Sequence, residues 1–104
     1  MIKEKFQQIS EEINSIKVFN AETYESYRKT VIYLRSILEN LKQQSSDPML
    51  NVWIEMGIQE LANEIQNRMG ESFAGLDKEH QKVVFMYSRS TVSLTLSNII
   101  LNLK

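Results

Sequence analysis

Apolar residues recur every three or four positions along most of this chain, which is the spacing of an amphipathic helix. The spacing predicts a first helix over residues 2–18 and a second, more strictly patterned helix over residues 21–44. Asn20 is a suitable N-cap for the second helix. Because the connection between the two segments is short, we expect them to pack as antiparallel neighbours. The two apolar lines are Ile2, Phe6, Ile9, Ile13 and Ile16, and Tyr24, Tyr27, Val31, Leu34, Leu38 and Leu41.

A third helix is predicted over residues 48–69. Asp47 is a preferred N-cap residue and Pro48 suits the first helical position. The first half of this segment is apolar almost all round, so we expect it to be the most deeply buried part of the fold, with Trp53 as an anchor. Gly57 in mid-helix costs about 1 kcal/mol relative to alanine, which indicates that a neighbouring helix packs closely there.

A fourth helix is predicted over residues 78–103, although part of this segment also fits a strand. The stretch STVSLTLS, residues 90–97, alternates polar and apolar positions with a period of two. A helical line passes through the same stretch, and the sequence offers no second strand for pairing. We therefore predict a helix, and an extended conformation stays open for residues 91–97. The helical line consists of Phe85, Val92, Leu96, Ile99 and Leu103.

The four segments predict an all-α fold, an antiparallel up-down four-helix bundle, in a single domain that spans residues 1–104. Three glycines and one proline in 104 residues suit long helices better than many short strands. A chain of this length buries enough apolar surface to fold without disulfides or a structural metal. Because it contains no cysteine, we expect neither a zinc–thiolate site nor a thiol nucleophile.

The charged residues nearly balance, with a formal net charge of −1 and an isoelectric point of about 5.8. Nucleic-acid-binding proteins usually carry a basic surface, so this balance argues against a DNA or RNA partner. The N-terminal stretch MIKEKFQQISEEI carries charges every few positions, which does not predict a signal peptide. The longest apolar run, residues 83–87, is much shorter than a membrane-spanning helix. We expect a cytoplasmic protein.

The stretch MGESFAGLDKEHQ, residues 69–81, holds two of the three glycines and the only histidine. A phosphate-binding loop has the order Gly-x-x-x-x-Gly-Lys-Ser/Thr after a strand, and this stretch has neither. We interpret it as a connector, in which Gly70 ends the third helix in the left-handed conformation and Asp77 caps the fourth. We expect Phe73 to fold back over the end of the bundle and His80 to lie in an exposed first turn.

No set of residues in the sequence predicts catalysis, and we expect no cofactor and no metal. His80 follows Asp77 at a spacing typical of metal ligands, but a carboxylate-bridged helical site needs repeated Glu-x-x-His pairs and further glutamates. A nucleophilic triad would need its characteristic serine motif, which is missing. Glu60 and Glu64 are expected on a solvated helix face, where like charges one turn apart are mildly unfavourable without a nearby cation. The sequence therefore predicts a protein that is not an enzyme.

Two groups of residues are candidates for contact with a partner. The first is a basic line at seven-residue spacing on the second predicted helix, which consists of Arg28, Arg35 and Lys42. Such a line either meets an acidic protein surface or lipid headgroups, or is simply a solvated polar face, and both interpretations stay open. The second group surrounds the connector and consists of Arg68, Phe73, His80 and Lys82.

The layout of the chain resembles the pediocin-like (class IIa) bacteriocin immunity proteins, the family that includes the enterocin A immunity proteins. The resemblance extends over nearly the full length, as a cysteine-free chain with four amphipathic segments. SSDPML, residues 45–50, is similar to the proline-containing connector before their third helix. ESFAGLDKEHQKVV, residues 71–84, is similar to the loop and polar start of their fourth. The chain departs from the family in having no distinct tail, because its apolar periodicity continues to Leu103.

The resemblance implies a cytoplasmic, antiparallel four-helix bundle that protects a Gram-positive producer cell from its own bacteriocin. Proteins of this family are not enzymes. They act at the inner face of the membrane, on the complex of the toxin with the mannose-phosphotransferase permease, and their C-terminal half governs which toxin is recognised. Here that half is residues 49–104. The resemblance thus implies a partly membrane-associated binding protein, with peripheral membrane contact and antimicrobial resistance as its effect.

A self-associating helical module, such as an adaptor subunit or a small secreted helical hairpin of the WXG type, is the alternative. Trp53 and Gly57 supply the two residue types of the WXG motif, but their spacing differs from it. The sequence does not determine the oligomeric state, and a monomer is the favoured expectation. An enzyme would rest on His80 alone.

Overall fold

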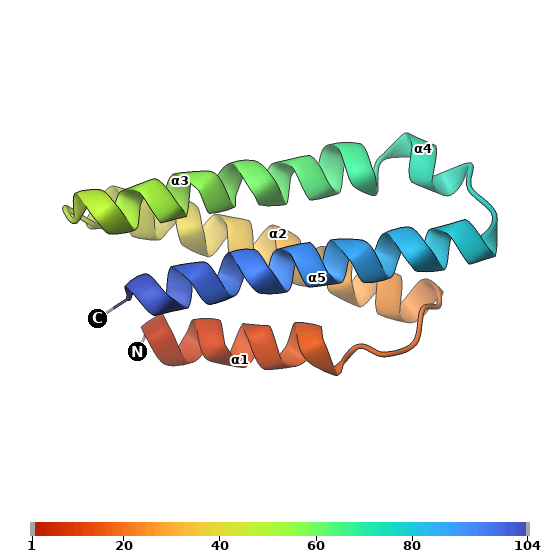
Figure 1. Cartoon of the computed structure of the whole chain (residues 1–104), viewed down its shortest axis with the longest axis horizontal. Helices are drawn as coiled ribbons and strands as arrows, with labels where there is room; N and C mark the ends of the chain where they lie inside the picture. The colour runs from red at the N-terminus through yellow and green to blue at the C-terminus, as the bar shows by residue number, and fades with distance from the viewer. Residues whose placement is uncertain (1, 104) are drawn as a thin grey trace.

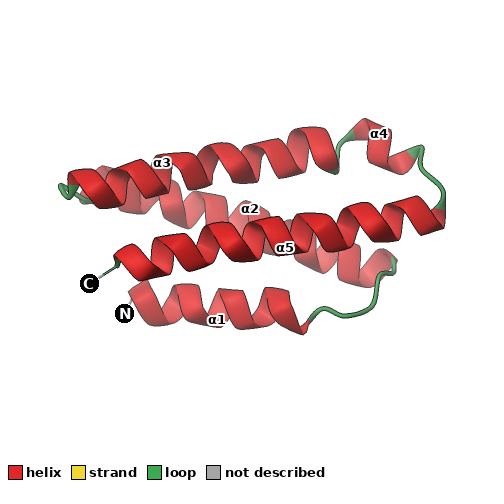
Figure 2. Cartoon of the chain, viewed as in Figure 1, coloured by secondary structure: helices red, strands yellow, loops and turns green. Residues whose placement is uncertain are grey.

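The computed structural model describes residues 2–103, and over this range it consists of helices and connections without a strand (Figure 2). The elements are α1 (Ile2–Ser15), α2 (Ala21–Gln44), α3 (Pro48–Asn63), the π-helical turn η1 (Glu64–Arg68), α4 (Glu71–Ala74) and α5 (Lys78–Asn102). The predicted all-α class is confirmed. The segment that also fitted a strand, residues 91–97, is helical.

The four long helices lie side by side, and successive ones run in opposite directions (Figure 1). α2 packs mainly against α3, α3 against α5, and α5 against α1. The molecule is elongated, with extents of 44 × 23 × 17 Å. Because successive long helices run in opposite directions, the connection from α1 to α2 lies at the same end as α4 and the start of α5, while the α2–α3 turn lies at the opposite end.

The predicted apolar lines supply most of the core. Each line faces inward from one side of its helix, and burial of each such side chain contributes roughly 1.5–3 kcal/mol. The helical conformation of residues 91–97 buries Val92 and Leu96 of the α5 line and turns Leu94 outward, whereas an extended conformation would place all three on one face. Buried side chains from the four long helices are Phe6, Ile9, Ile13, Tyr27, Val31, Leu34, Leu38, Leu50, Ile54, Leu61, Phe85, Val92, Leu96 and Ile99.

Side-chain caps determine where α2, α3 and α5 begin, as the sequence predicts. Asn20 Oδ1 accepts the Thr23 N–H (2.8 Å) and Thr23 Oγ1 accepts the Asn20 N–H (2.9 Å), which is a reciprocal capping box. Asp47 accepts two N–H groups of the first turn of α3, where Pro48 needs no donor. Asp77 accepts an N–H of the first turn of α5 at 2.8 Å.

α1 ends at Ser15, earlier than the predicted residue 18. The guanidinium of Arg89, on α5, donates a hydrogen bond of 2.6 Å to the carbonyl oxygen of Ile16. This tertiary contact satisfies a backbone acceptor just past the end of α1. The chain then runs in an irregular connection to the capping box of α2, so the prediction of three further helical residues is wrong.

α3 also differs from its prediction, because the helix predicted over residues 48–69 changes register near its end. The α-helix stops at Asn63 and continues as η1, where the Met69 N–H bonds to the carbonyl oxygen of Glu64, five residues earlier (2.9 Å). A π-helical turn accommodates one extra residue and re-aims the side chains that follow it. Met69, which follows the extra residue, is buried, whereas Glu64 is buried as the next position of the inward line through Gly57 and Leu61.

Gly70 does not adopt the predicted left-handed conformation. Its φ is −82°, and no residue within 2–103 has a positive φ. A glycine is needed here for a different reason, because a Cβ atom would lie 2.2 Å from the carbonyl oxygen of Gln66. The end of the third helical segment is therefore sterically reserved for glycine.

The first half of α3 is not the most deeply buried part of the fold. Met49, Val52 and Met56 are each more than half exposed, and Trp53 is half-buried. Among the long helices, α2 and α5 are the ones that pack closely on α3, so its remaining sides face outward.

Gly57 confirms the predicted close packing of a neighbouring helix. A Cβ atom at this position would lie 2.8 Å from Ile99 Cδ1 and 3.3 Å from Leu38 Cδ1. The missing side chain lets α2 and α5 approach α3 closely at this level, which offsets the low helix propensity of glycine.

Candidate functional site

Aromatic side chains gather where the α1–α2 connection meets α4. Phe73 of α4 stacks on Tyr24 of α2, with ring centroids 4.9 Å apart and 9° between the ring planes. Phe19 of the connection packs edge-on against both rings, at 6.1 and 6.3 Å, and lies 5.1 Å from Phe85 of α5. The prediction that Phe73 folds back over the end of the helices is confirmed, since its side chain is buried. We call Phe19, Tyr24 and Phe73 the aromatic cluster.

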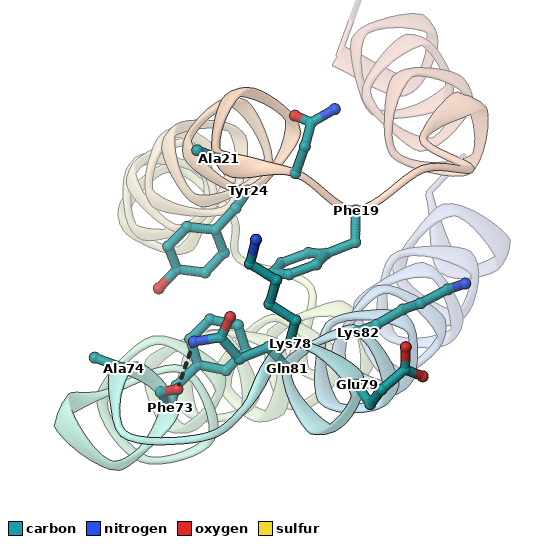
Figure 3. Close-up of a pocket in the computed structure, with 10 residues that line it drawn as sticks. Phe19, Ala21, Tyr24, Phe73, Ala74, Lys78, Glu79, Gln81 and Lys82 are labelled. Carbon is teal, nitrogen blue, oxygen red and sulfur yellow. Dashed lines mark hydrogen bonds between the residues drawn. The ribbon is translucent and has the colours of Figure 1, made fainter.

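A cavity of about 660 Å³ opens beside the aromatic cluster (Figure 3). The three rings line it together with the small side chains of Ala21 and Ala74. Its polar rim comes mainly from the first turns of α5. We call this hollow the end cavity, and its rim residues from α5 are Lys78, Glu79, Gln81 and Lys82. Its volume and mainly apolar lining are typical of binding sites for small molecules or for single side chains of a partner.

Two lysines give the rim of the end cavity a positive charge. Lys78 and Lys82 lie one turn apart on α5, are exposed, and have no ion-pair partner within residues 2–103. Lys78 extends toward the α1–α2 connection in Figure 3. Gln81 Nε2 donates a hydrogen bond of 3.1 Å to the Phe73 carbonyl oxygen, which fixes α4 against α5. The rim therefore suits a partner group that is negatively charged or that presents a carbonyl oxygen.

The expectation that Glu64 lies on a solvated face is wrong. Its side chain is fully buried, and Oε2 accepts a hydrogen bond of 2.7 Å from Arg68 Nε. The Arg68 guanidinium lies over the Tyr87 ring, 4.4 Å from its centroid. Arg68 is the nearby cation that offsets the like charges of Glu60 and Glu64. Its hydrogen bond to Glu64 raises the pKa of the Arg68 guanidinium.

A second polar contact lies in the same interior region. The Tyr27 hydroxyl of α2 and the Ser88 hydroxyl of α5 share a hydrogen bond of 2.8 Å, and both side chains are buried. Burial raises the pKa of Tyr27 well above its usual value, although the hydrogen bond with Ser88 acts in the opposite direction. The phenol is therefore neutral at physiological pH and joins α2 to α5 as a structural contact.

His80 and Asp77 form a local pair at the start of α5. The imidazole Nδ1 lies 2.7 Å from Asp77 Oδ1, the same oxygen that caps the helix, and both side chains are exposed. Two hydrogen bonds lower the pKa of Asp77: the larger effect comes from the backbone N–H of His80 and the smaller one from its imidazole. Within residues 2–103 no group of three or more His, Asp or Glu side chains is placed to hold a metal ion.

The structure brings only some of the candidate residues near the connector together. Phe73 and Lys82 line the end cavity, while His80 lies outside its lining. Arg68 is on η1 and belongs to the interior ion pair. Arg28 lines a separate, shallow hollow beside η1 and α4.

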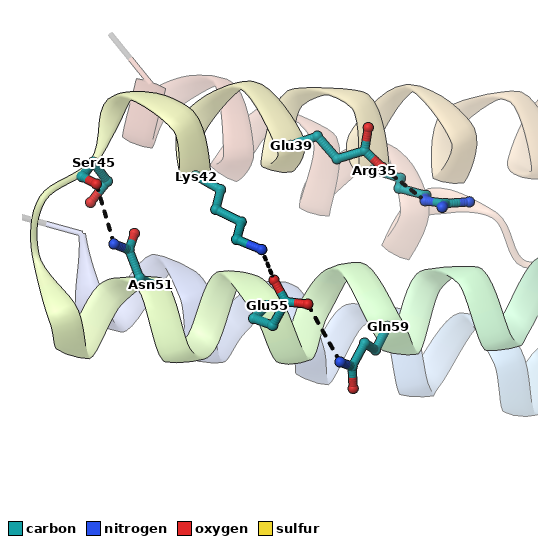
Figure 4. A network of polar contacts seen from close by, with 7 residues as sticks. All are labelled: Arg35, Glu39, Lys42, Ser45, Asn51, Glu55 and Gln59. Carbon is teal, nitrogen blue, oxygen red and sulfur yellow. Dashed lines mark hydrogen bonds and ion pairs between the residues drawn. The ribbon is translucent and has the colours of Figure 1, made fainter.

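The other two residues of the basic line are held by acidic side chains of the same chain (Figure 4). Arg35 Nε lies 3.2 Å from Glu39 Oε1, one turn along α2. The Lys42 ammonium binds the carboxylate of Glu55 on α3, and this hydrogen bond lowers the pKa of Glu55. The line is thus divided into two internal ion pairs and Arg28.

Sequence reasoning missed Phe19, Lys78 and Gln81. For Phe19 a signal was present, because an apolar residue directly before an N-cap packs against the fourth residue of the helix in a hydrophobic staple. Here those residues are Phe19 and Tyr24 on either side of the Asn20 cap. Lys78 and Gln81 carried no such signal, since their role depends on which other segments meet the start of α5.

Comparisons of the chain with protein-family models, with curated proteins and with solved structures find no match. No helix within residues 2–103 is both long enough and apolar enough to cross a membrane.

Proposed function

We propose that this protein is a non-catalytic binding protein, an antiparallel up-down four-helix bundle that recognises its partner through the end cavity. The observation that carries the proposal is the combination of three aromatic rings with two lysines that have no ion-pair partner among the described residues 2–103. Aromatic rings supply large, rigid contact areas at recognition sites. Lysines at the rim attract negatively charged groups and favour their approach.

The titratable groups near the end cavity support binding rather than chemistry. A general acid or base must lie within hydrogen-bond reach of the reacting group. The His80 ring bonds to Asp77 outside the cavity lining, and the Tyr27 hydroxyl is buried against Ser88. Lys78 and Lys82 are exposed, so they are better suited to electrostatic contact than to proton transfer.

We further infer that the partner is a pediocin-like bacteriocin bound to the mannose-phosphotransferase permease, so that the protein confers immunity from the cytoplasmic face. The layout of four amphipathic segments supports this inference. The position of the end cavity also supports the inference. α4 and the start of α5 belong to the C-terminal half of the chain, and in the family that the chain resembles this half governs toxin recognition. A basic rim also suits peripheral contact with the anionic headgroups of the inner leaflet.

The test is to express the protein in a sensitive Gram-positive strain and to challenge the cells with a panel of pediocin-like bacteriocins. The proposal predicts survival against one or a few toxins of the panel, with no protection against toxins that use another receptor. Unchanged killing by every pediocin-like toxin, with the protein detected in the cells, would contradict the immunity function.

A further inference from the structure

The outer surface of α3 and α5 is apolar and nearly uncharged. Seven of the twelve exposed large hydrophobic side chains within residues 2–103 lie on these two helices. They are Met49, Val52, Met56, Val83, Tyr87, Leu94 and Leu101. In addition, residues 90–103 contain no charged side chain at all. Solvated helix faces usually carry charges, whereas the centres of protein interfaces are depleted of them. We call this surface the α3–α5 face.

α5 contributes a ridge to the α3–α5 face. Its members follow one another at intervals of four, seven and seven residues, so they lie along one line of the helix. They are Val83, Tyr87, Leu94 and Leu101, which are exposed by 67, 59, 65 and 81%. At about 1.5 Å per residue the ridge is about 27 Å long.

A groove of about 360 Å³ lies between α3 and α5, directly beside the ridge. Gly57 of α3 is among the residues that line it. Apart from Glu60, the groove is lined by uncharged side chains, among them Trp53 and Met56 of α3 and Thr91, Thr95 and Asn98 of α5. A groove between two helices accepts a third helix that presents apolar residues at i, i+4 and i+7.

We propose that the α3–α5 face binds a second copy of this chain, with the α5 ridge of each copy seated in the groove of the other. A two-fold interface is formed by the same patch on both subunits, so that patch must contain both complementary shapes. The α3–α5 face contains them side by side. Leu94 and Leu101 of the ridge lie in the uncharged stretch 90–103, so two copies meet at this half of the ridge without like-charge repulsion.

The available area is that of a weak interface. A fully exposed apolar side chain offers about 60–120 Å², so the seven side chains, each more than half exposed, offer about 350 Å² per copy. Apolar atoms make up about 60% of an interface, which gives roughly 1,200 Å² buried in the dimer, at the lower end of specific interfaces. We expect a reversible dimer with a dissociation constant on the order of 100 μM. The association requires neither toxin nor permease.

Sedimentation equilibrium of the whole protein up to about 1 mM tests the proposal, because this range brackets the expected constant. The parent protein is expected to dimerise, and Leu94→Arg is expected to weaken the dimer at least tenfold. Ile32→Arg is the matched control, since Ile32 is 49% exposed on α2, away from the face. A parent protein that stays monomeric throughout, or a Leu94→Arg variant that dimerises as well as Ile32→Arg, would overturn the proposal.

A cross-linking experiment locates the contact even if arginine disturbs folding. The chain has no cysteine, so a single introduced thiol can pair only with its copy. In the proposed dimer the two α5 helices cross near the middle of the ridge. Leu94→Cys is therefore expected to form a disulfide-linked dimer on mild oxidation much faster than Ile32→Cys. Equal rates for the two variants would contradict the proposed geometry.

Discussion

Within residues 2–103, Arg68 is the only side chain that forms an ion pair with the buried carboxylate of Glu64, and its removal is the most informative perturbation of stability. Glu64 is fully buried, Oε2 accepts the bond from Arg68, and Oε1 has no hydrogen-bond partner within residues 2–103. Breaking a buried ion pair by removing one partner costs about 3–5 kcal/mol. Because the Arg68 side chain is 32% exposed, water screens part of this loss, and we expect Arg68→Leu to cost about 2–3 kcal/mol.

The same reasoning predicts that a second substitution restores most of the lost stability. Replacing a buried ion pair by apolar side chains of similar size is often close to neutral. The double variant with Glu64→Leu and Arg68→Leu is therefore expected to lie within about 1 kcal/mol of the parent. This rescue separates the electrostatic effect from a simple loss of packing, which the second substitution would not repair.

Urea unfolding followed by far-ultraviolet circular dichroism measures the effect. With a denaturant dependence of about 1–3 kcal/mol per M, Arg68→Leu should lower the unfolding midpoint by about 0.7–3 M. The parent is expected to be stable by about 5–15 kcal/mol, so the variant still folds. If the costs of the two single substitutions simply add in the double variant, the buried carboxylate is not the source of the instability and the reasoning is refuted.

Tyr27→Phe leaves the buried Ser88 hydroxyl without its partner at 2.8 Å, so chemical denaturation should show a loss of about 1–2 kcal/mol, which adding Ser88→Ala partly recovers. Gly57→Ala gains about 1 kcal/mol of helix propensity but places its Cβ 2.8 Å from the flexible tip of Ile99. Its unfolding midpoint should therefore stay near the parent's, whereas Gly57→Leu should cost about 1–3 kcal/mol, and a fully stable Gly57→Leu would contradict the close packing. Asp77→Ala removes the α5 cap and should lower the melting temperature in calorimetry. The pKa of Asp77 is lower in the folded than in the unfolded protein, so the ionised cap stabilises the folded state above about pH 4. The difference in melting temperature between Asp77→Ala and the parent should therefore vanish as the pH falls through the pKa of folded Asp77. A difference that is independent of pH would exclude the carboxylate as its cause.

The helices were predictable because their signals are local. The apolar spacing of α2 and the caps at Asn20, Asp47 and Asp77 determine helix positions from neighbouring residues alone, and the structure confirms them. The period-two pattern of residues 90–97 did not produce a strand. A strand would place Val92, Leu94 and Leu96 on one face, whereas Val92 and Leu96 are buried and Leu94 is 65% exposed, as the helical period requires.

The errors lie where a distant segment decides the outcome. α1 ends early at a carbonyl that Arg89 binds from α5. Glu64 continues the inward line of Leu61, and its burial depends on the helices that pack around it, where Arg68 pairs with it. Neither contact is visible in the spacing of apolar residues.

The candidate site was predictable only in part, for the same reason. Phe73 and Lys82 belong to the end cavity, but the opposite wall comes from Phe19 and Tyr24, 49 to 63 residues earlier in the chain. The basic line on α2 was clear in the sequence, yet its interpretation depended on Glu55 of α3, which pairs with Lys42. A sequence pattern shows which residues share a helix face, and the packing of helices decides what that face meets.

The central proposal is that the rim of the end cavity recognises the partner, and bacteriocin survival with reversed charges at the rim tests it most directly. Cells expressing the parent protein are compared with cells expressing Lys78→Glu with Lys82→Glu. The control combines Lys3→Glu with Lys29→Glu, the same change in charge at exposed lysines of α1 and α2. We predict that the rim variant loses protection and the control keeps it. Equal protection by the two variants would contradict the assignment of the end cavity as the binding site.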